Sequence, residues 1–532
     1  MGRFTIFSLR GCSDCKRTKA AFKEYGIPFV EINLSKYPDR RNDMLSLSDR
    51  LTVPQVFMNE THLGGAEETV KLLRKWAKDA NRSPLERYQK VVMAAPDPKD
   101  LRFHPSTGPP AIKESAPPPR DRRNVIKVPN KDNTVKKKRK MSVLEMTELL
   151  KKTLPCRELK YNLTVYKNAF KANELIDALE ELFFSSKTSS TSSREEALTF
   201  GRDILQERYG IVDHVVEDHV LKDTPSLFFR LTCHQTPNVL NSYRKWTERV
   251  DPDPMRLLKT LNTALMTILS EHTNDKTGKV DYKAAYQNPE FLAFEEATCE
   301  LQGVDLGQMK PDLKLAFCIN LYNMMIKYAF CRVGIFTSDN ARHSFFSNVS
   351  FRIGPHVFSF QDLESGILRG NRKPPFSLTA PFNAAKDVRA AFMFKEVDCR
   401  IHFALNCGGA SCPPVKDFTA ESIQEELRIV ALAFCEENVT FVGHQGDGRY
   451  KEILLPKIFS WYQEDFGSNH SALLRTIYNF SRGKRQVVLQ SMLGSGHAPK
   501  VKFEPYDWST DASDFVSYSG GKVKANSSRF LQ

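Results

Sequence analysis

The sequence contains 532 residues, with 77 Lys and Arg against 63 Asp and Glu, which gives a formal net charge of +14. This length excludes a single hydrophobic core, because domains average about 150 residues and three or four of them are expected. Eleven cysteines, an odd number spread along the chain, exclude a secreted disulfide framework. No stretch approaches the ~18 apolar residues that span a membrane, and the N-terminus does not form a signal peptide. We therefore expect a multidomain cytoplasmic protein.

Two cysteines stand where the first predicted helix begins. Residues 3–9 predict a short strand and residues 16–25 a helix, with Cys12 and Cys15 forming a Cys-x-x-Cys pair at the junction. Because unpaired N–H groups and the helix dipole stabilise an anion at a helix start, we expect the pKa of Cys12 to lie below its free value of about 8.5. Cys15, one turn later, is placed to resolve a mixed disulfide.

A zinc site is the alternative for this pair of thiols. Cys-x-x-Cys supplies only two of the four ligands of a structural zinc ion, and the sequence holds no second Cys-x-x-Cys. The following residues predict a strand over 27–34, a helix over 39–49, a strand over 52–58 and a helix over 66–78. This alternation is typical of a small α/β domain and favours the redox interpretation.

The segment 1–80 contains six residues whose types and separations form a motif: Cys12, Cys15, Val53, Pro54, Gly64 and Gly65. With these residues at these separations, the segment resembles glutaredoxin, a thioredoxin-like α/β domain. The resemblance implies that Cys12 is the nucleophile, and that a cis peptide bond before Pro54 presents backbone to glutathione. It also implies that the glycine pair binds one end of glutathione. Glutathione is therefore the expected cofactor, and a protein disulfide or a glutathione mixed disulfide is the expected substrate.

Two positions depart from the glutaredoxin pattern. Asp14 places a negative charge between the two thiols, and Leu9 stands where the family has a lysine. Two hypotheses follow from the whole pattern. In the first, the domain is a glutathione-linked thiol-disulfide oxidoreductase. In the second, which Asp14 and Leu9 favour, it senses redox state or only binds, as part of a non-catalytic signalling scaffold.

The positive charge is concentrated between residues 81 and 140. This stretch contains 16 Lys and Arg, 6 Asp and Glu, and 10 of the 29 prolines, without a sustained hydrophobic period. The composition predicts a disordered linker, which we place at residues 81–142. The rest of the chain is nearly neutral and shows no basic surface interleaved with aromatic residues, which argues against nucleic acid as a partner.

Five consecutive cations close the basic stretch: Lys136, Lys137, Lys138, Arg139 and Lys140. Such a run is typical of a nuclear import signal, of a patch that binds anionic membrane, or of an ordinary solvated linker. All three interpretations stay open. A nuclear or membrane-associated fraction would therefore depend on this run.

Residues 143–235 predict a second domain, with one amphipathic helix over 170–179 and another over 194–208. The sequences Asn-Glu-Leu-Ile at 173–176 and Phe-Phe-Arg-Leu at 228–231 make this segment resemble the DEP domain. The resemblance implies a small, mainly helical, winged-helix-like module. It also implies a non-catalytic role, in which the module recruits the chain to a signalling protein or to an anionic membrane.

Residues 251–470 predict a third, α+β domain. Its first helix, over 254–270, has a single apolar stripe, whereas the helix over 314–325 is apolar on nearly every side and must be buried. The buried helix contains Asn320 and Asn323, one turn apart. An unsatisfied buried amide costs about 1–3 kcal/mol, so these side chains either bind neighbouring backbone or are retained for a site.

A second candidate site lies in the third domain. Alternating apolar residues over 401–405 predict a strand with His402 and Asn406 on its polar face, and the glycine pair at 408–409 predicts a sharp turn. We place this candidate site at His402, Asn406, Cys407 and Ser411.

Three interpretations of this second candidate site stay open. In the first, the residues are simply part of the core, because Cys is among the most buried residue types. A cysteine hydrolase would need one thiol near the imidazole, with backbone N–H groups for an oxyanion. A zinc ion would take Cys399, His402, Cys407 and Cys412, but a strand places Cys399 and His402 on opposite faces. We therefore expect no metal site.

The motifs Ile-Asn-Leu-Tyr-Asn at 319–323 and Asp-Leu-Glu at 362–364, with the segment 402–413, make residues 290–470 resemble the domain-of-unknown-function 547 family. This family has no characterised activity. Residues 489–532 are rich in Gly and Ser and predict a flexible tail. The expected architecture is multidomain: a thioredoxin-like α/β domain, a winged-helix-like DEP domain and an α+β domain.

Overall fold

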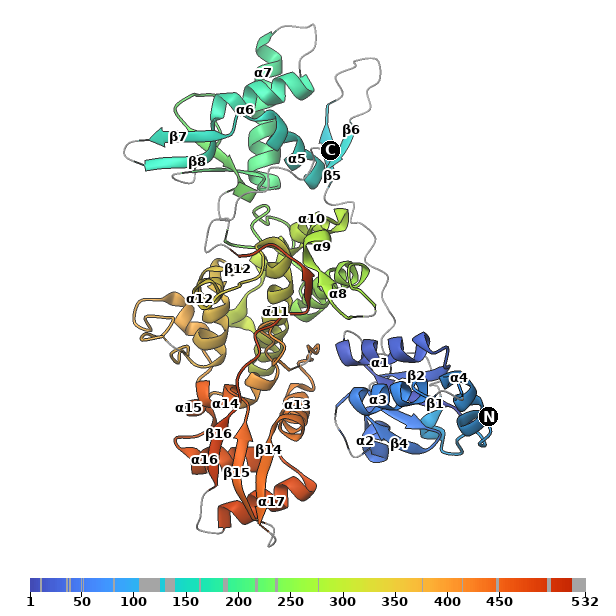
Figure 1. Cartoon of the computed structure of the whole chain (residues 1–532). Helices are drawn as coiled ribbons and strands as arrows, with labels where there is room; N and C mark the ends of the chain where they lie inside the picture. Colours follow the sequence, from blue (N-terminus) through green and yellow to red (C-terminus); the bar gives the residue numbers. More distant parts are fainter. Residues whose placement is uncertain are drawn as a thin grey trace.

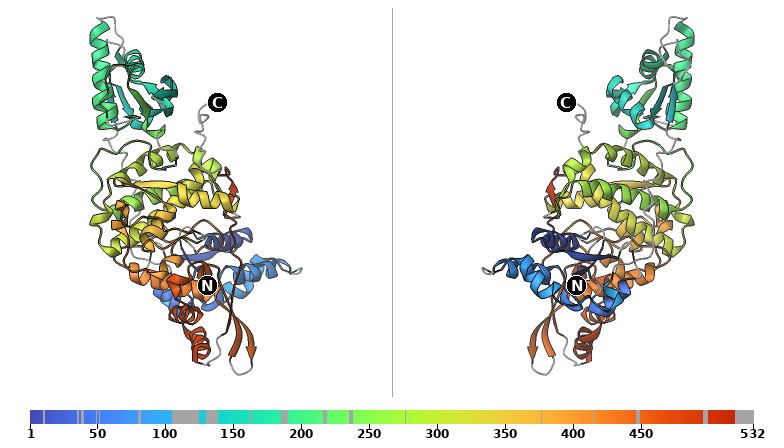
Figure 2. Two further views of the ribbon diagram at one scale, coloured as in Figure 1. Left: turned by 90° about the vertical axis from the view of Figure 1, so that its left-hand side faces the viewer. Right: turned by 90° about the vertical axis from the view of Figure 1, so that its right-hand side faces the viewer.

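The computed structural model describes residues 1–9, 12–34, 37, 40–48, 50, 52–79, 82–104, 125–129, 139–161, 164–184, 190–215, 219–234, 238–275, 277–375, 377–413, 415–445, 449–494 and 499–518. Within these residues the chain forms three domains, coloured blue, teal and green to red in chain order (Figure 1). Figure 2 shows the second domain at one end of the third. None of the described helices combines the length and the hydropathy needed to cross a bilayer.

The first domain contains β1 (Phe4–Ser8), α1 (Ser13–Glu24), β2 (Phe29–Asn33), α2 (Arg40–Ser48), β3 (Gln55–Met58), β4 (Thr61–Gly64) and α3 (Ala66–Ala77). Its sheet has the order β2-β1-β3-β4, with β1 parallel to β2 and antiparallel to β3. All five residues of β1 are buried, because this strand is central and is covered on both faces. The expected thioredoxin-like α/β fold is present.

The first domain extends beyond the predicted boundary at residue 80. Residues 82–104 form α4 (Pro84–Arg87), η1 (Tyr88–Met93) and η2 (Leu101–Phe103). The ring of Tyr88 stacks on Phe4 at 5.9 Å, and the ring of Phe103 packs on Phe57 at 5.1 Å between centroids. The linker prediction is therefore wrong for these residues. A few aromatic side chains that reach the core outweigh a proline-rich, charged composition.

The second domain contains β5 (Val125–Val128), β6 (Arg139–Ser142), α5 (Val143–Thr153), β7 (Arg157–Tyr161), β8 (Thr164–Lys171), α6 (Ala172–Leu179), η4 (Glu180–Phe184), α7 (Ser190–Phe200), η5 (Gly201–Arg208), β9 (Val212–His214), β10 (Phe228–Leu231) and η6 (Thr232–His234). Its helices pack on a sheet of order β7-β8-β10-β9. This layout agrees with a small winged-helix-like domain.

The hairpin of β5 and β6 corrects the other end of the predicted linker. Ile126 and Val128 of β5 are buried in the core of the second domain, and β6 pairs antiparallel with β5. Arg139 and Lys140, the last two cations of the basic run, lie in β6. The other three cations, and residues 105–124, lie outside the described residues.

The third domain begins with α8 (Pro254–Glu271), β11 (Val280–Asp281), α9 (Tyr282–Gln287), α10 (Pro289–Ala297), η7 (Thr298–Gly303), η8 (Leu306–Gln308), α11 (Pro311–Arg332), α12 (Asp339–Asn348), β12 (Ser350–Ile353), β13 (His356–Ser359), η9 (Asp362–Leu368), η10 (Val388–Phe392) and η11 (Cys399–Phe403). It continues with α13 (Ile423–Asn438), β14 (Thr440–Gln445), β15 (Arg449–Leu455), α14 (Ile458–Trp461), α15 (Gln463–Phe466), α16 (His470–Asn479), α17 (Gly483–Gly494), β16 (Lys500–Phe503) and β17 (Ala512–Asp514). Helix α11 is buried on nearly every side, as its sequence predicts.

The predicted flexible tail is wrong over the described residues 489–494 and 499–518. Strand β16 pairs parallel with β15, and β17 pairs parallel with β11. Tyr518 is buried in the main core of the third domain. Backbone pairing with distant strands therefore orders a segment whose own composition is weakly patterned. Residues 519–532 lie outside the described residues.

We expect Phe103→Ala to lower the free energy of unfolding of the first domain by about 3–5 kcal/mol, because a large buried ring is lost. Leu101→Ala, two residues away, is the matched control, since Leu101 is 79% exposed. The free energy of unfolding is measured by urea titration of the full chain. Proteolytic cleavage within residues 1–104 monitors the unfolding of the first domain. Equal stability of the two variants would contradict the extended domain boundary.

Candidate functional site

Cys12 caps the N-terminus of α1 with its sulfur. The N–H group of Cys15 donates a hydrogen bond to the Cys12 sulfur at 3.1 Å. Cys12 is partly exposed, whereas Cys15 is fully buried. The geometry thus gives the two thiols of the first candidate site different environments.

The same hydrogen bonds separate the pKa values of the two thiols. Hydrogen bonds from Cys15 lower the pKa of Cys12, while burial and the negative charge of Asp14 oppose this effect. The pKa of Cys15 is raised, first by its hydrogen bond to Cys12 and then by burial. Asp14 forms an exposed ion pair with Arg17 at 3.1 Å, which offsets part of its charge. Cys12 is therefore suited to attack as a thiolate, and Cys15 stays a protonated thiol.

Backbone from a second loop approaches the Cys12 sulfur. The peptide bond between Val53 and Pro54 is cis, as the resemblance implies. The Cys12 thiol donates a weak hydrogen bond to the carbonyl oxygen of Val53 at 3.7 Å. Polar backbone of residue 53 therefore lies next to the sulfur that would react.

The glycine pair leads into α3, where a carboxylate already binds the helix start. The N–H group of Gly65 donates to the carboxylate of Glu68 at 3.0 Å, and Glu68 also pairs with Arg50 at 3.4 Å. Gly64 has φ 119°, and a Cβ there would lie 2.8 Å from the Glu68 side chain. Glu68 was not among the predicted site residues, although its position three residues after the N-cap is typical of a capping box.

The second candidate site does not have the predicted backbone. Residues 399–403 form the 3-10 helix η11 and not a strand, because Asp398 caps its N-terminus by accepting a hydrogen bond from the N–H group of Arg400. The predicted strand, which was expected to place Cys399 and His402 on opposite faces, is therefore wrong. Among the described residues, no three His, Cys, Asp or Glu side chains are grouped so as to hold a metal ion.

His402 belongs to a buried ion network. Its Nε2 atom lies 2.7 Å from the carboxylate of Asp465, which also accepts hydrogen bonds from Arg369 at 2.6 Å and Arg372 at 2.5 Å. The Asp465 side chain is fully buried, and the ring of Tyr462 stacks on His402 at 3.9 Å. Burial lowers the pKa of His402, while hydrogen bonds from His402 and Arg369 hold the pKa of Asp465 well below its usual range.

The four residues of the second candidate site have separate partners. Asn406 bridges its own loop, accepting from the N–H group of Gly408 at 2.9 Å and donating to the carbonyl of Pro413 at 2.8 Å. Ser411 accepts a hydrogen bond from the N–H group of Asp507. Cys407 lies beside Cys412 and Tyr506. Among the described residues, no hydrogen bond joins His402 to either thiol.

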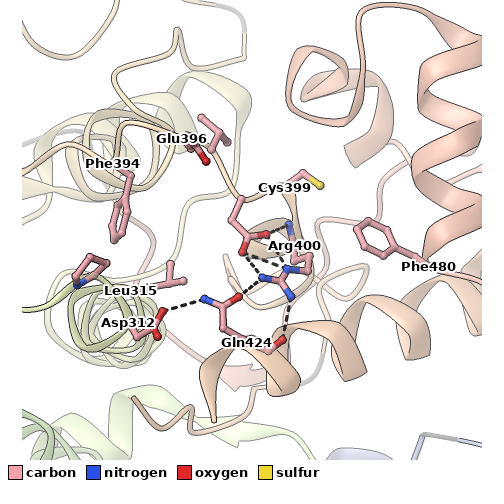
Figure 3. Close-up of a pocket in the computed structure, with 11 residues that line it drawn as sticks. Asp312, Leu315, Phe394, Glu396, Cys399, Arg400, Gln424 and Phe480 are labelled. Carbon is pink, nitrogen blue, oxygen red and sulfur yellow. Dashed lines mark hydrogen bonds and ion pairs between the residues drawn. The ribbon is translucent and has the colours of Figure 1, made fainter. Parts of the chain in front are cut away.

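A cavity of about 580 Å³ lies in the third domain beside the start of η11 (Figure 3). Arg400 and Gln424 line it and are joined by hydrogen bonds, and Gln424 also donates to Asp312 at 2.9 Å. Cys399 is the thiol in this lining, and burial raises its pKa to about 12. The cavity therefore contains neither His402 nor an activated thiol.

We expect Asp465→Asn to destabilise the third domain by about 3–5 kcal/mol, because it leaves the buried guanidinium of Arg369 without its main counter-charge. Glu464→Gln is the matched control, since Glu464 pairs with the same Arg369 but its side chain is 58% exposed. An effect below about 1 kcal/mol is expected for the control. Urea unfolding of the full chain compares the two, and a small loss for Asp465→Asn would exclude a structural ion network.

Three family models match the chain in the order of the three domains. They are Glutaredoxin at residues 4–63, the domain found in Dishevelled, Egl-10 and Pleckstrin (DEP) at residues 153–231, and the protein of unknown function DUF547 at residues 306–435.

Curated proteins similar to this chain match its first domain. Glutaredoxin 3 of Escherichia coli strain K12 is 32% identical over 72 residues, which cover 14% of this chain and 87% of that protein. Glutaredoxin-C4 of Arabidopsis thaliana is 39% identical, covering 13% of this chain and 53% of that protein. The mitochondrial glutaredoxin-2 of Homo sapiens is 36% identical, covering 13% of this chain and 43% of that protein.

Proposed function

The chain belongs to the glutaredoxin family through its first domain, and we propose that this domain is a glutathione-linked thiol-disulfide oxidoreductase. The observation that carries the proposal is the hydrogen bond from the N–H group of Cys15 to the Cys12 sulfur at 3.1 Å. This bond favours the Cys12 thiolate, which is the attacking species in disulfide exchange.

The reaction proceeds through a mixed disulfide. The Cys12 thiolate attacks one sulfur of a protein disulfide or of a glutathione mixed disulfide, and the other sulfur leaves as a thiolate. The mixed disulfide on Cys12 is then resolved either by Cys15 or by glutathione. Since the pKa of Cys15 is raised, we expect glutathione to be the main resolving thiol.

The start of α3 controls how strongly glutathione binds. In our proposal, a carboxylate of glutathione approaches the N–H groups of Gly64 and Gly65, where a helix N-terminus attracts anions. Glu68 already accepts the hydrogen bond from Gly65 and repels a second carboxylate. Glu68 must therefore move, or the bound glutathione must share the site with Arg50.

The second domain bears on where this chemistry would take place. We propose that the DEP domain recruits the chain to a signalling protein or to an anionic membrane in the cytoplasm, with the basic run ending in β6 adding attraction for anionic surfaces. The non-catalytic scaffold stays as the alternative. A cysteine hydrolase is not carried forward, because the described contacts of His402 and Cys407 are separate.

We expect Cys12→Ser to abolish reduction of a glutathione mixed disulfide, because the nucleophile is lost. Cys15→Ser should keep this activity, because glutathione itself resolves the intermediate. Turnover of a glutathionylated peptide by the full chain, coupled to glutathione reductase, measures both variants. Cys156→Ser, in the second domain, is the control. Equal loss in the Cys12 and Cys15 variants would contradict the assigned roles.

We expect Glu68→Gln to lower KM for a glutathione mixed disulfide by about two- to fivefold with little change in kcat, because one like charge near a helix start is removed. Glu67→Gln is the matched control, since both carboxylates are exposed in the first turn of α3 but only Glu68 binds Gly65. Steady-state kinetics measure KM and kcat of both variants, and KM should fall only in Glu68→Gln. An unchanged KM in Glu68→Gln would place glutathione elsewhere.

A further inference from the structure

A second pair of thiols lies close together in the third domain. The sulfur atoms of Cys407 and Cys412 are 3.1 Å apart, about 1 Å longer than the ~2.05 Å of a disulfide bond. Both thiols are free and partly exposed. The two sulfurs can therefore bond after a small movement.

The loop between the two cysteines is held in place by its backbone. Gly408 has φ 92°, and a Cβ on it would lie 2.4 Å from the ring of Phe330, so only glycine fits this turn. The N–H group of Cys412 donates to the carbonyl of Gly409 at 3.0 Å. The Asn406 side chain also joins the two ends of this loop, through its hydrogen bonds to Gly408 and Pro413. The proximity of the sulfurs is thus built into the fold.

Tyr506 adds a hydroxyl to the two thiols. Its oxygen lies 3.0 Å from the Cys412 sulfur and 3.3 Å from the Cys407 sulfur. The ring of Tyr506 packs against Trp461 at 4.9 Å and against Trp508 at 4.6 Å between centroids. Because a hydroxyl donates only one proton, it can stabilise one thiolate at a time. Tyr506 lies within the predicted flexible tail, so only the fold identifies it as a partner of the two thiols.

The arrangement repeats the main feature of the first candidate site. The N–H group of Cys407 donates to the Cys412 sulfur at 3.2 Å, just as the N–H group of Cys15 donates to the Cys12 sulfur at 3.1 Å. Hydrogen bonds from Cys407, followed by the one from Tyr506, lower the pKa of Cys412 to about 7. The hydrogen bond to Cys412 and burial raise the pKa of Cys407.

Other thiols of the third domain lack this feature. Burial raises the pKa of Cys299, Cys318 and Cys399 to about 12 in each case. These thiols stay protonated and are inert towards disulfides.

We propose that Cys407 and Cys412 form a second redox-active dithiol, which closes to a disulfide by exchange with a low-molecular-weight disulfide of the glutathione type. Cys412 is the attacking thiol, Cys407 is the resolving thiol and Tyr506 is a positioning residue. The proposal goes beyond the function proposed for the first domain and does not require Cys12.

The exchange balances in two steps. The Cys412 thiolate attacks one sulfur of glutathione disulfide, forming a mixed disulfide and releasing one glutathione thiolate, which takes the proton of Cys407. The Cys407 thiolate then attacks the Cys412 sulfur, forms the Cys407 to Cys412 disulfide and releases the second glutathione thiolate. This thiolate takes up the proton that Cys412 lost at the outset. Two protein thiols are oxidised, and one glutathione disulfide is reduced to two glutathione molecules.

The test uses the full chain, reduced and then exposed to glutathione disulfide at several ratios to glutathione. Trypsin cuts after Arg400 and Lys416, so both thiols lie on one peptide that contains no other cysteine. We expect this peptide to become two hydrogen atoms lighter and to lose both alkylation sites. The Cys407→Ser variant should accumulate glutathione on Cys412, whereas the Cys412→Ser variant should form little adduct.

Three further variants make the test specific. Cys399→Ser, which removes a nearby inert thiol, should leave the oxidation unchanged. Tyr506→Phe should shift the pH midpoint of the reaction upwards, since the Cys412 thiolate loses a hydrogen-bond donor. Cys12→Ser should have no effect, so that failure of the first domain's function is distinguishable from failure here. A peptide that stays fully alkylated, equal adducts on the two single variants, or a requirement for Cys12 would overturn the proposal.

Discussion

The burial of α11 is the constraint on which the third domain depends. This helix of 22 residues is surrounded by core, so each amide that it buries must find a partner within the protein. Asn323 donates to the carbonyl of Ala404 at 2.9 Å and accepts from the N–H group of Asn406 at 2.8 Å. Asn320 binds both backbone groups of Phe418 in the same way. Buried Asn323 and half-buried Asn320 thereby anchor the two ends of the loop that carries Cys407 and Cys412.

The same helix also holds the C-terminal segment in place. Lys327 of α11 pairs with Asp511 at 2.8 Å, and Tyr282 donates to the same carboxylate. Strand β17 follows directly and pairs with β11. Tyr506 and Trp508 lie a few residues before Asp511 and β17. The contacts of Asp511 and β17 therefore help to position the aromatic rings beside the second dithiol. A segment with little intrinsic structure becomes part of a site because its ends are fixed.

The pKa shifts of the paired thiols follow from hydrogen bonding more than from nearby cations. At both dithiols a main-chain N–H group donates to one sulfur, and the pKa of that thiol falls while the pKa of its neighbour rises. In the second domain, burial raises the pKa of Cys156, and it raises that of Cys233 to about 11. Among the described cysteines with a shifted pKa, a lowered pKa therefore occurs only at Cys12 and Cys412, one thiol of each close pair.

The sequence by itself determined the order of the three domains, the first redox pair and the buried helix, because each depends on local spacing. Cys12 and Cys15 lie on one turn of helix, and the apolar pattern of α11 repeats within a few residues. Only the tertiary structure decided the partners of His402 and Cys407. Asp465 is 63 residues from His402, and Tyr506 is 99 residues from Cys407, so no local period could join them. Residues 399–403 likewise form η11 and not the predicted strand. The alternating pattern covers only five residues, and the Asp398 side chain caps the helix by accepting a hydrogen bond from the N–H group of Arg400.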